Sequence, residues 1–224
     1  MHSALRYGLL VALICSPFLL HAQVNDAGLW MNIEAEKIIT PALSASVTGE
    51  VRMNENITEV GTVLTDVGLN YRLWKRFDVG LTYRYSGKRR LDDSYDQRHG
   101  WFADATYRVK VKPAVIDLRL RFQSRYTDIL TSEDGNIPRN HLRGRVKLKL
   151  DLDRRYEPYV SGEAFYRVGG ADGMLFDELR CMAGVEVEFN RAHAIDLHYM
   201  VTREYNVNNP RTDYVVGVGY HFTF

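Results

Sequence analysis

Residues 116–126 read IDLRLRFQSRY, in which apolar side chains alternate with polar or charged ones, except that Ser124 falls in the apolar phase. Leu118, Leu120 and Phe122 share one face of an extended chain, and the residues between them carry charge to the other face. A period of two indicates a β-strand whose two faces meet different surroundings. Such a stretch exceeds the mode of about 5–6 residues for strands in globular proteins and matches the roughly 9–11 residues of a tilted membrane strand.

The same alternation recurs along the whole chain. Clear copies occupy 43–53, 77–86, 141–150 and 213–224, and weaker copies occupy 29–37, 62–73, 101–111, 158–168, 177–189 and 194–203. Because single-chain bacterial barrels generally have an even number of strands, we expect one of these eleven assignments to change. Either 29–37 lies outside the wall, or a boundary is missed within 58–73. The predicted fold is all-β, a transmembrane antiparallel up-and-down β-barrel of about 10–12 strands.

A soluble exported β-domain is the main alternative to a membrane barrel. Aromatic residues near the strand ends favour the barrel, because they form girdles at both membrane interfaces. They are Trp30, Trp74, Trp101, Tyr126, Tyr156, Tyr166, Tyr199 and Phe224. Connections are tight at 74–76, 112–113 and 190–193, and long and polar at 87–98, 127–139, 169–176 and 204–212. We therefore expect short turns, and the C-terminus, at a periplasmic rim.

The first 22 residues are predicted to be a signal peptide. Arg6 supplies a positive start, an apolar run follows from Gly8 to Leu20, and cleavage is expected near Ala22-Gln23. The apolar run is too short for a membrane helix, which needs about 20 residues. The chain thus divides into a signal peptide at 1–22 and a barrel at 23–224, located in the bacterial outer membrane.

Composition excludes several other classes. The formal net charge is +1, which argues against a nucleic-acid binder. Of the two cysteines, Cys15 leaves with the signal peptide, so Cys181 has no partner for an internal disulfide. Cys181 shares its phase with apolar neighbours and is expected to face lipid. No phosphate loop, dinucleotide fingerprint or zinc spacing is present, and no metal or other cofactor is expected.

Tyr220, Phe222 and Phe224 share one phase at the end of the chain. This ending resembles the C-terminal signal that the barrel assembly machinery recognises. The mature chain also resembles a poorly characterised family of small bacterial outer-membrane barrels, catalogued as a domain of unknown function. That resemblance lies in Leu29-Trp30, in Glu50-Val51-Arg52, in Tyr83-Arg84-Tyr85, and in Pro158 with Glu163. It implies a fold and a location, and no established activity.

If the apolar phase faces lipid, the polar phase lines the lumen. The basic residues expected there are Arg108, Lys110, Arg119, Arg121, Arg125, Arg143, Arg145, Lys147 and Lys149. The acidic residues on the following strands are Glu163, Glu178, Glu186, Glu188 and Asp196. This distribution predicts a basic wall opposite an acidic one.

Two functions follow from such a lumen. The first is a narrow passive channel, in which the basic ladder steers small anionic solutes. The alternative is a closed structural or ligand-binding barrel whose interior is filled by salt bridges. The two differ in conductance across a planar bilayer.

A lipid-modifying enzyme is a third hypothesis. It would need a nucleophile such as a serine beside a histidine. His99, His141, His193, His198 and His221 have no obvious serine partner, so we predict no enzymatic activity. The polar loops at 87–98 and 132–136 could contact lipopolysaccharide or a divalent cation, but their spacing fits no calcium loop, and ordinary solvated loops are expected. The expected partners are therefore membrane lipid, lipopolysaccharide and the assembly machinery.

Overall fold

The structure is a computed structural model that describes residues 24–127, 137–152, 155–169 and 173–224. The predicted signal peptide and its cleavage site lie outside these residues. No helix in the described ranges is long and apolar enough to cross a membrane.

Eleven strands form the fold, and each predicted segment corresponds to one of them. Their bounds are β1 (Val24–Ile38), β2 (Leu43–Asn54), β3 (Glu59–Trp74), β4 (Phe77–Arg89), β5 (Tyr95–Val111), β6 (Ala114–Thr127), β7 (Arg139–Leu150), β8 (Tyr156–Val168), β9 (Met174–Glu188), β10 (His193–Glu204) and β11 (Arg211–Thr223). Most strands extend a few residues beyond the alternating stretch, because backbone pairing continues where side chains no longer alternate.

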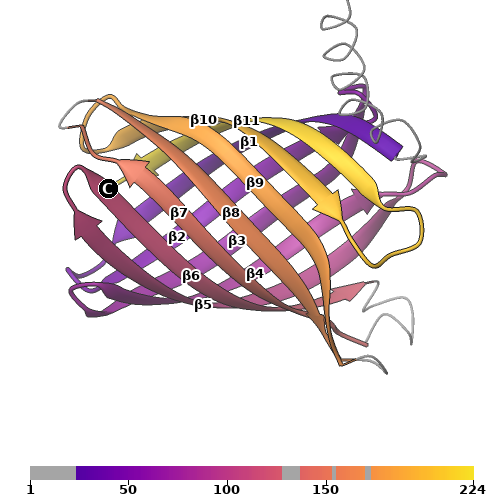
Figure 1. Cartoon of the computed structure of the whole chain (residues 1–224), viewed down its shortest axis with the longest axis horizontal. Coiled ribbons are helices and arrows are strands. Elements are labelled where there is room, and N and C mark those ends of the chain that lie inside the picture. Colours follow the sequence, from indigo (N-terminus) through magenta and orange to yellow (C-terminus); the bar gives the residue numbers. More distant parts are fainter. Residues whose placement is uncertain (1–23, 128–136, 153–154, 170–172) are drawn as a thin grey trace, which may run out of the picture.

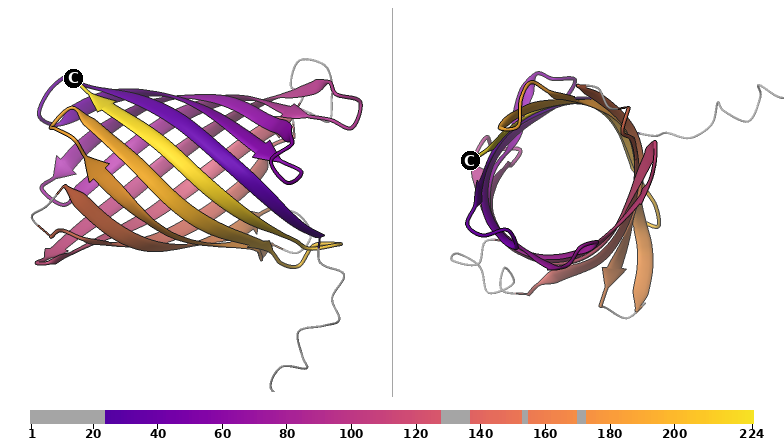
Figure 2. Two further views of the ribbon diagram at one scale, coloured as in Figure 1. Left: turned by 90° about the horizontal axis from the view of Figure 1, so that it is seen from above. Right: turned by 90° about the vertical axis from the view of Figure 1, so that its left-hand side faces the viewer.

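The strands close into a single barrel, as the view along its axis in Figure 2 shows. Sequential neighbours pair antiparallel, whereas β1 and β11 pair parallel, from Val24 opposite Arg211 to Glu36 opposite Thr223. The all-β barrel prediction is confirmed. The expectation of an even number of strands is wrong, because β1 lies in the wall and 59–74 is one unbroken strand. A parallel closing pair lets an odd number of strands form a sheet without an exposed edge.

The odd number places the two ends of the barrel sequence at opposite rims, as Figure 1 shows for the long tilted strands. The rim at Phe224 carries short connections, which include Lys75-Arg76, Lys112-Pro113 and the turn at 39–42. We call it the short-turn rim, and we call the other the loop rim. The predicted long loop at 87–98 is wrong, because β4 and β5 pair as far as Arg89 and Tyr95 and leave only 90–94 unpaired.

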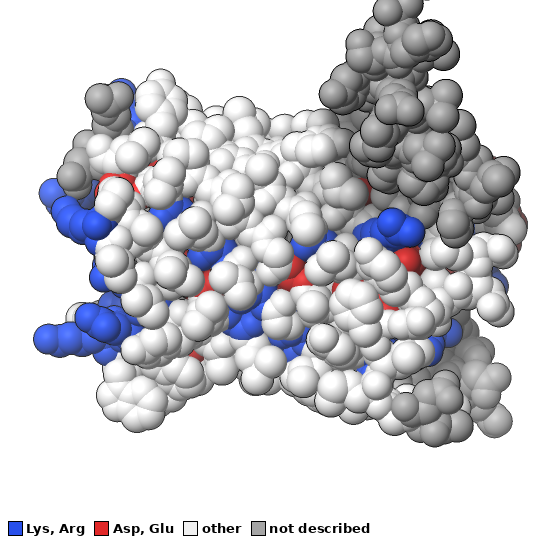
Figure 3. Space-filling model, in the orientation of Figure 1, with Lys and Arg blue, Asp and Glu red and all other residues white. Residues whose placement is uncertain are grey.

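The outer wall is apolar. Ile33, Val67 and Leu120 are 65%, 52% and 53% exposed, and large apolar side chains are exposed on every strand. In Figure 3 the outer wall is mostly uncharged, and lysines and arginines protrude at the short-turn rim. A continuous exposed apolar belt of this kind is typical of outer-membrane-type β-barrels, whose fold this chain has.

The predicted aromatic girdle is correct in part. Trp74, Tyr156 and Phe224 are exposed near strand ends, at 69%, 59% and 55%. Trp30, in contrast, points inward, where its ring lies 3.8 Å from the Arg52 guanidinium. Its placement in the girdle is wrong, because it occupies the polar phase of β1 with Asn32 and Glu34.

Candidate functional site

The lumen is lined by charged side chains whose positions follow from strand pairing. On β6 and β7, Arg119 lies directly opposite Arg145, and Arg121 lies directly opposite Arg143. Like charges directly opposite each other destabilise a sheet. These four arginines therefore need carboxylates from elsewhere in the barrel.

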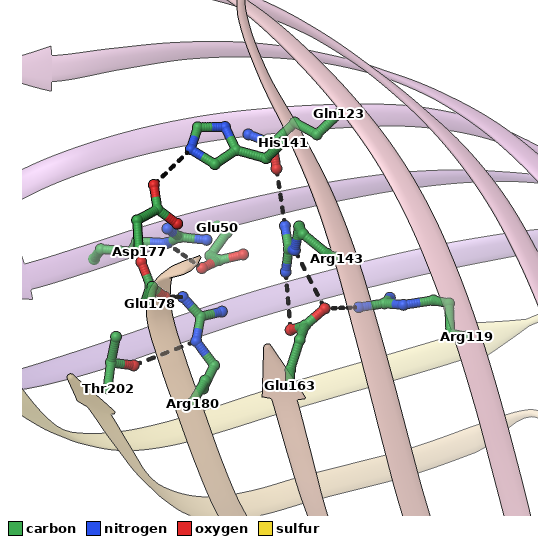
Figure 4. Close-up of polar contacts among 11 residues, drawn as sticks. Glu50, Arg119, Gln123, His141, Arg143, Glu163, Asp177, Glu178, Arg180 and Thr202 are labelled. Atoms are coloured by element: carbon green, nitrogen blue, oxygen red, sulfur yellow. Dashed lines mark hydrogen bonds and ion pairs between the residues drawn. The ribbon is translucent and has the colours of Figure 1, made fainter. Parts of the chain in front are cut away.

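Glu163 on β8 supplies one of these carboxylates (Figure 4). It accepts hydrogen bonds from Arg143 Nε at 3.2 Å and Nη2 at 2.9 Å, and from Arg119 Nη2 at 2.7 Å. The Arg119 contact reaches past β7, so it ties together strands that are not neighbours. Glu163 and Arg143 are only 5% and 8% exposed. Buried charges are tolerated only when paired and hydrogen-bonded, so this cluster fixes the interior of the barrel.

Two other arginines of the basic strands, Arg121 and Arg108, have aspartate partners close by. Asp104 accepts two hydrogen bonds of 2.6 Å from Arg121, and Asp117 pairs with Arg108 at 2.7 Å. The sequence interpretation did not include these two aspartates. The basic sector thus carries its own acids, and a basic wall facing an acidic wall is too simple a description.

The remaining predicted lumen residues divide into a paired and an unpaired group. Lys149 lies 2.5 Å from Glu157 and 3.7 Å from Glu186, and Lys147 lies 4.0 Å from Glu186. Ion pairs also join Glu178 to Arg180 at 2.9 Å and Asp196 to His198 at 2.5 Å. Within the described ranges, no ion pair involves Lys110, Arg125, Arg145 or Glu188, and Lys110 and Glu188 are exposed.

A layer of large apolar side chains occupies the polar phase in the middle of the lumen. Its members are Trp30, Leu64, Phe102, Phe165, Met200 and Val215. Leu64, Phe102, Met200 and Val215 are at most 3% exposed. Sequence reasoning missed this layer, although each residue interrupts an otherwise polar phase, and that interruption was the available signal. We call these six residues, with Arg52, Arg84, Arg143, Glu163 and Arg180, the plug layer.

Cation–π contacts join plug-layer residues on different strands across the lumen. The Arg180 guanidinium lies 5.4 Å from the Trp30 ring and 5.0 Å from the Phe165 ring. Since Arg180 is on β9 and Trp30 is on β1, with β10 and β11 between them, the first contact crosses the interior. Arg143 covers Phe165 at 4.2 Å, and Arg84 covers Phe102 at 4.9 Å. Desolvated contacts of this kind are worth about 2 kcal/mol each.

Cavities lie on both sides of the plug layer. On the short-turn side, a cavity of 890 Å³ reaches the turn residues Thr40, Pro41 and Ala42, and an adjoining cavity of 360 Å³ shares Thr48 and Arg145 with it. We call these two together the vestibule. On the loop-rim side lies a smaller cavity of 150 Å³, lined by Leu64 and Phe102 of the plug layer among others. The small cavity shares no lining residue with the vestibule, and the plug layer lines only the small cavity.

Arg145 lies where the two parts of the vestibule meet. Its Nε is buried and has no hydrogen-bond partner, and the same is true of Nε in Arg119, which lies opposite. Glu163 and Asp104 serve the other three arginines of this group, so one cation is left over in the part of the chain that the structure describes. Arg145 lies directly opposite Glu163 on β8 without forming an ion pair with it, so donors of its guanidinium face the polar cavity, where they can bind an anion.

Comparison with known proteins places the chain in a family. A family model described as a protein of unknown function, DUF2490, matches residues 27–213. The chain belongs to this family. Among solved structures, the chain is similar to the β domain of the Bordetella autotransporter BrkA, with 10% identity, a TM-score of 0.49, and coverage of 81% of this chain and 82% of that chain. The search of curated proteins found no match.

The resemblance drawn from the sequence is confirmed, and the DUF2490 match includes every motif on which it rested. Glu163, one of those motif residues, is the buried acid of the plug layer. The last residues of the chain lie beyond the match. There Phe222 stacks on Phe224 with ring centroids 5.2 Å apart, and the Lys37 ammonium lies 4.8 Å from the Phe224 ring. Their role as an assembly signal, together with Tyr220, stays a prediction.

The histidines and the one cluster of three carboxylates in the described part of this DUF2490 barrel have hydrogen-bond or ion-pair partners close by, and none forms a serine–histidine pair. In the described ranges no hydrogen bond joins a serine to a histidine, while His141 contacts Asp177 at 3.1 Å and His198 contacts Asp196 at 2.5 Å. Glu157, Glu186 and Glu188 bring three carboxylates together, but the Lys149 ammonium already neutralises part of their charge. Cys181 is exposed on the outer face of β9.

Proposed function

We propose that this protein lies in the bacterial outer membrane, with its outer wall against lipid and lipopolysaccharide and its final strand recognised by the assembly machinery. The exposed apolar belt supports this location. Subcellular fractionation tests it, with N-terminal sequencing expected to begin at Gln23. A folded protein that stays in the periplasmic fraction without detergent would contradict the proposal.

We further propose that the barrel is closed and binds a small anionic solute in the vestibule. The observation that carries this proposal is Arg145, a partly buried arginine that lines both parts of the vestibule and forms no ion pair with any described residue. The plug layer supports closure, because its phenylalanines, arginines and Glu163 fill the section of the lumen above the vestibule. A catalytic role is not part of the proposal.

Thiol modification tests the vestibule. Thr48, which lines both of its parts, is changed to cysteine in a Cys181→Ser background. An anionic sulfonate methanethiosulfonate and a cationic trimethylammonium one are then compared. Since Arg145→Gln removes one positive charge that attracts the anionic reagent to Thr48→Cys, we expect the rate ratio of anionic to cationic reagent to fall about fivefold or more. Lys75→Gln at the rim is the matched control and should leave the ratio unchanged.

An unchanged ratio in the Arg145→Gln protein would refute the binding proposal. A narrow anion channel is the second candidate, and it is favoured by the presence of cavities on both sides of the plug layer. Planar-bilayer recordings distinguish the two. The closed barrel predicts no unitary conductance steps for the wild-type protein, whereas anion-selective steps would establish the channel.

A further inference from the structure

The 150 Å³ cavity on the loop-rim side is lined by cations and by no acid. Its wall includes Arg52, Arg84, Lys88, Arg98 and Arg125, and none of its described lining residues is an aspartate or glutamate. The vestibule differs, since its arginines alternate with Glu34, Asp66, Asp104 and other carboxylates. Concentration of one sign of charge around an enclosed polar space raises the local concentration of the opposite ion.

Three of the five cations have carboxylate partners outside the cavity wall. Arg84 makes a bidentate pair with Asp66 at 2.6 and 2.7 Å, and Arg52 pairs with Glu50 at 2.5 Å. Arg98 lies 3.8 Å from Asp96. The partners of Arg84 and Arg52 hold these two guanidinium groups in place and leave other donors to face the cavity, because each guanidinium has five N–H groups.

Lys88 and Arg125 have no such partner. Among the described residues neither forms an ion pair, and Nε of Arg125 is buried without a hydrogen-bond partner. Arg125 also lies directly opposite Arg139 on the neighbouring strand, so pairing across the sheet adds repulsion instead of relief. A buried donor without a partner is costly and calls for a ligand, water or ion.

The remaining wall suits a compact oxyanion. Thr62, Ser86 and Gln123 contribute hydroxyl and amide groups, and Leu64 with Phe102 forms the apolar floor. On the roughly 30 Å³ that each water occupies in the liquid, the space corresponds to about five waters. That volume accommodates one phosphate-sized group with part of its hydration shell. Arginine recognises such groups in bidentate fashion, and lysine adds a point charge.

We propose that this cavity is a binding site for a phosphate group, with Lys88 and Arg125 supplying the two uncompensated charges. The site is distinct from the vestibule, with which it shares no lining residue. It lies near the hairpin turn at 90–94, since Lys88 is the penultimate residue of β4 and Arg98 is close to the start of β5. The phosphate can be a free ion or the phosphate monoester of a lipid, and both present the same oxygens.

The test uses the full mature chain, refolded in detergent and freed of phosphate. Inorganic phosphate is titrated by calorimetry at constant ionic strength set with sodium chloride, in an Arg145→Gln background that removes the proposed vestibule site, and saturable binding at one site is expected. Lys88→Gln and Arg125→Gln should each weaken binding at least about tenfold, because each removes a charge-assisted contact. Lys75→Gln, in the turn between β3 and β4 at the short-turn rim, is the matched control and should leave phosphate binding unchanged.

A lipid arm separates the two sources. The protein is incubated with lipid A or with dephosphorylated lipid A, and the bound species are detected by native mass spectrometry. Displacement of inorganic phosphate by lipid A alone identifies a lipid phosphate, and no displacement identifies the free ion. Absence of saturable phosphate binding would overturn the proposal. So would phosphate affinity in the Lys88→Gln and Arg125→Gln proteins equal to that of the protein with Lys88 and Arg125 intact. Thermal melts of the variants, compared with wild type, exclude misfolding as the cause of lost binding.

Discussion

Glu163 and Arg143 form a bidentate ion pair in the middle of the barrel, where neither side chain is more than 8% exposed. Arg119 adds a third hydrogen bond to the same carboxylate from two strands away. The pair therefore joins β6, β7 and β8 through side chains as well as through the backbone ladder. It also belongs to the plug layer.

Glu163→Gln should destabilise the barrel. Removal of one partner leaves two arginines buried near each other without a carboxylate, which costs about 3–5 kcal/mol in typical buried pairs. Urea-induced unfolding of the refolded protein in lipid vesicles measures the free energy. The control is Glu188→Gln, which changes an exposed carboxylate and should have little effect. Equal stability of the two variants would show that the buried pair is not a stabilising element.

Removal of aromatic rings from the plug layer should open the lumen. Phe102→Ala with Phe165→Ala deletes two buried rings, and the arginines that cover them lose their packing surface. We expect unitary conductance steps in planar bilayers that the wild-type protein lacks. Phe122→Ala, on the outer wall, is the control. Each buried ring deletion costs about 3–5 kcal/mol, so Phe165→Ala alone is measured as well. If the double variant folds but shows no conductance, Phe102 and Phe165 do not block the lumen.

The orientation of the outer wall predicts where a charge is tolerated. Leu120→Arg, at the centre of β6, should lower the unfolding free energy by about 2–4 kcal/mol in vesicles, since it places a guanidinium in hydrocarbon. Ile39→Arg in the turn at 39–42 should cost no more than about 1 kcal/mol, because it lies at the interface. Both residues are exposed, at 53% and 52%. Similar costs for the two variants would argue that the wall at Leu120 does not contact lipid.

A disulfide should form across the parallel closing pair. Met31 on β1 and Val218 on β11 are partners in the register, and both point outward. Cysteines at these two positions in a Cys181→Ser background should cross-link on oxidation, because paired Cα atoms fall within the 4.4–6.8 Å range of disulfides. The cross-linked chain is detected by its altered migration in non-reducing gels. Cysteines at Met31 and Gly219 point to opposite faces and should not cross-link. Efficient cross-linking of that second pair would disprove the register.

Alternation alone predicted most of the wall. It assigned Leu118, Leu120 and Phe122 to one face and Arg119 with Arg121 to the other, because the pleat of a strand is local. It could not predict that β1 and β11 pair in parallel. The expected even number of strands came from known barrels, and no residue in this sequence reports the direction of the closing pair. It also could not predict that Arg180 meets Trp30, because contacts across a lumen depend on the stagger of the whole barrel.

The candidate sites show the same division. The lumen position of Arg145 follows from its phase, but its lack of an ion pair emerges only when Asp104 and Glu163 are seen to serve other arginines. The loop-rim cavity depends on Lys88, which the sequence placed in a loop and the structure places in β4. The backbone pairing of β4 continues beyond its alternating stretch as far as Arg89, and no pattern in the side chains indicates this.

The parallel seam between β1 and β11 has a consequence for biogenesis. Beginning from Phe224, β11 to β2 form five hairpins whose connected strand ends all lie at the loop rim, and β1 is left as a single strand with a free leading end. In a membrane with the short turns inside, that free end must be drawn through the bilayer by itself and emerges on the cell surface. A peptide fused ahead of Val24 would then be displayed outside the cell, whereas in a barrel closed by an antiparallel pair it would remain within the envelope.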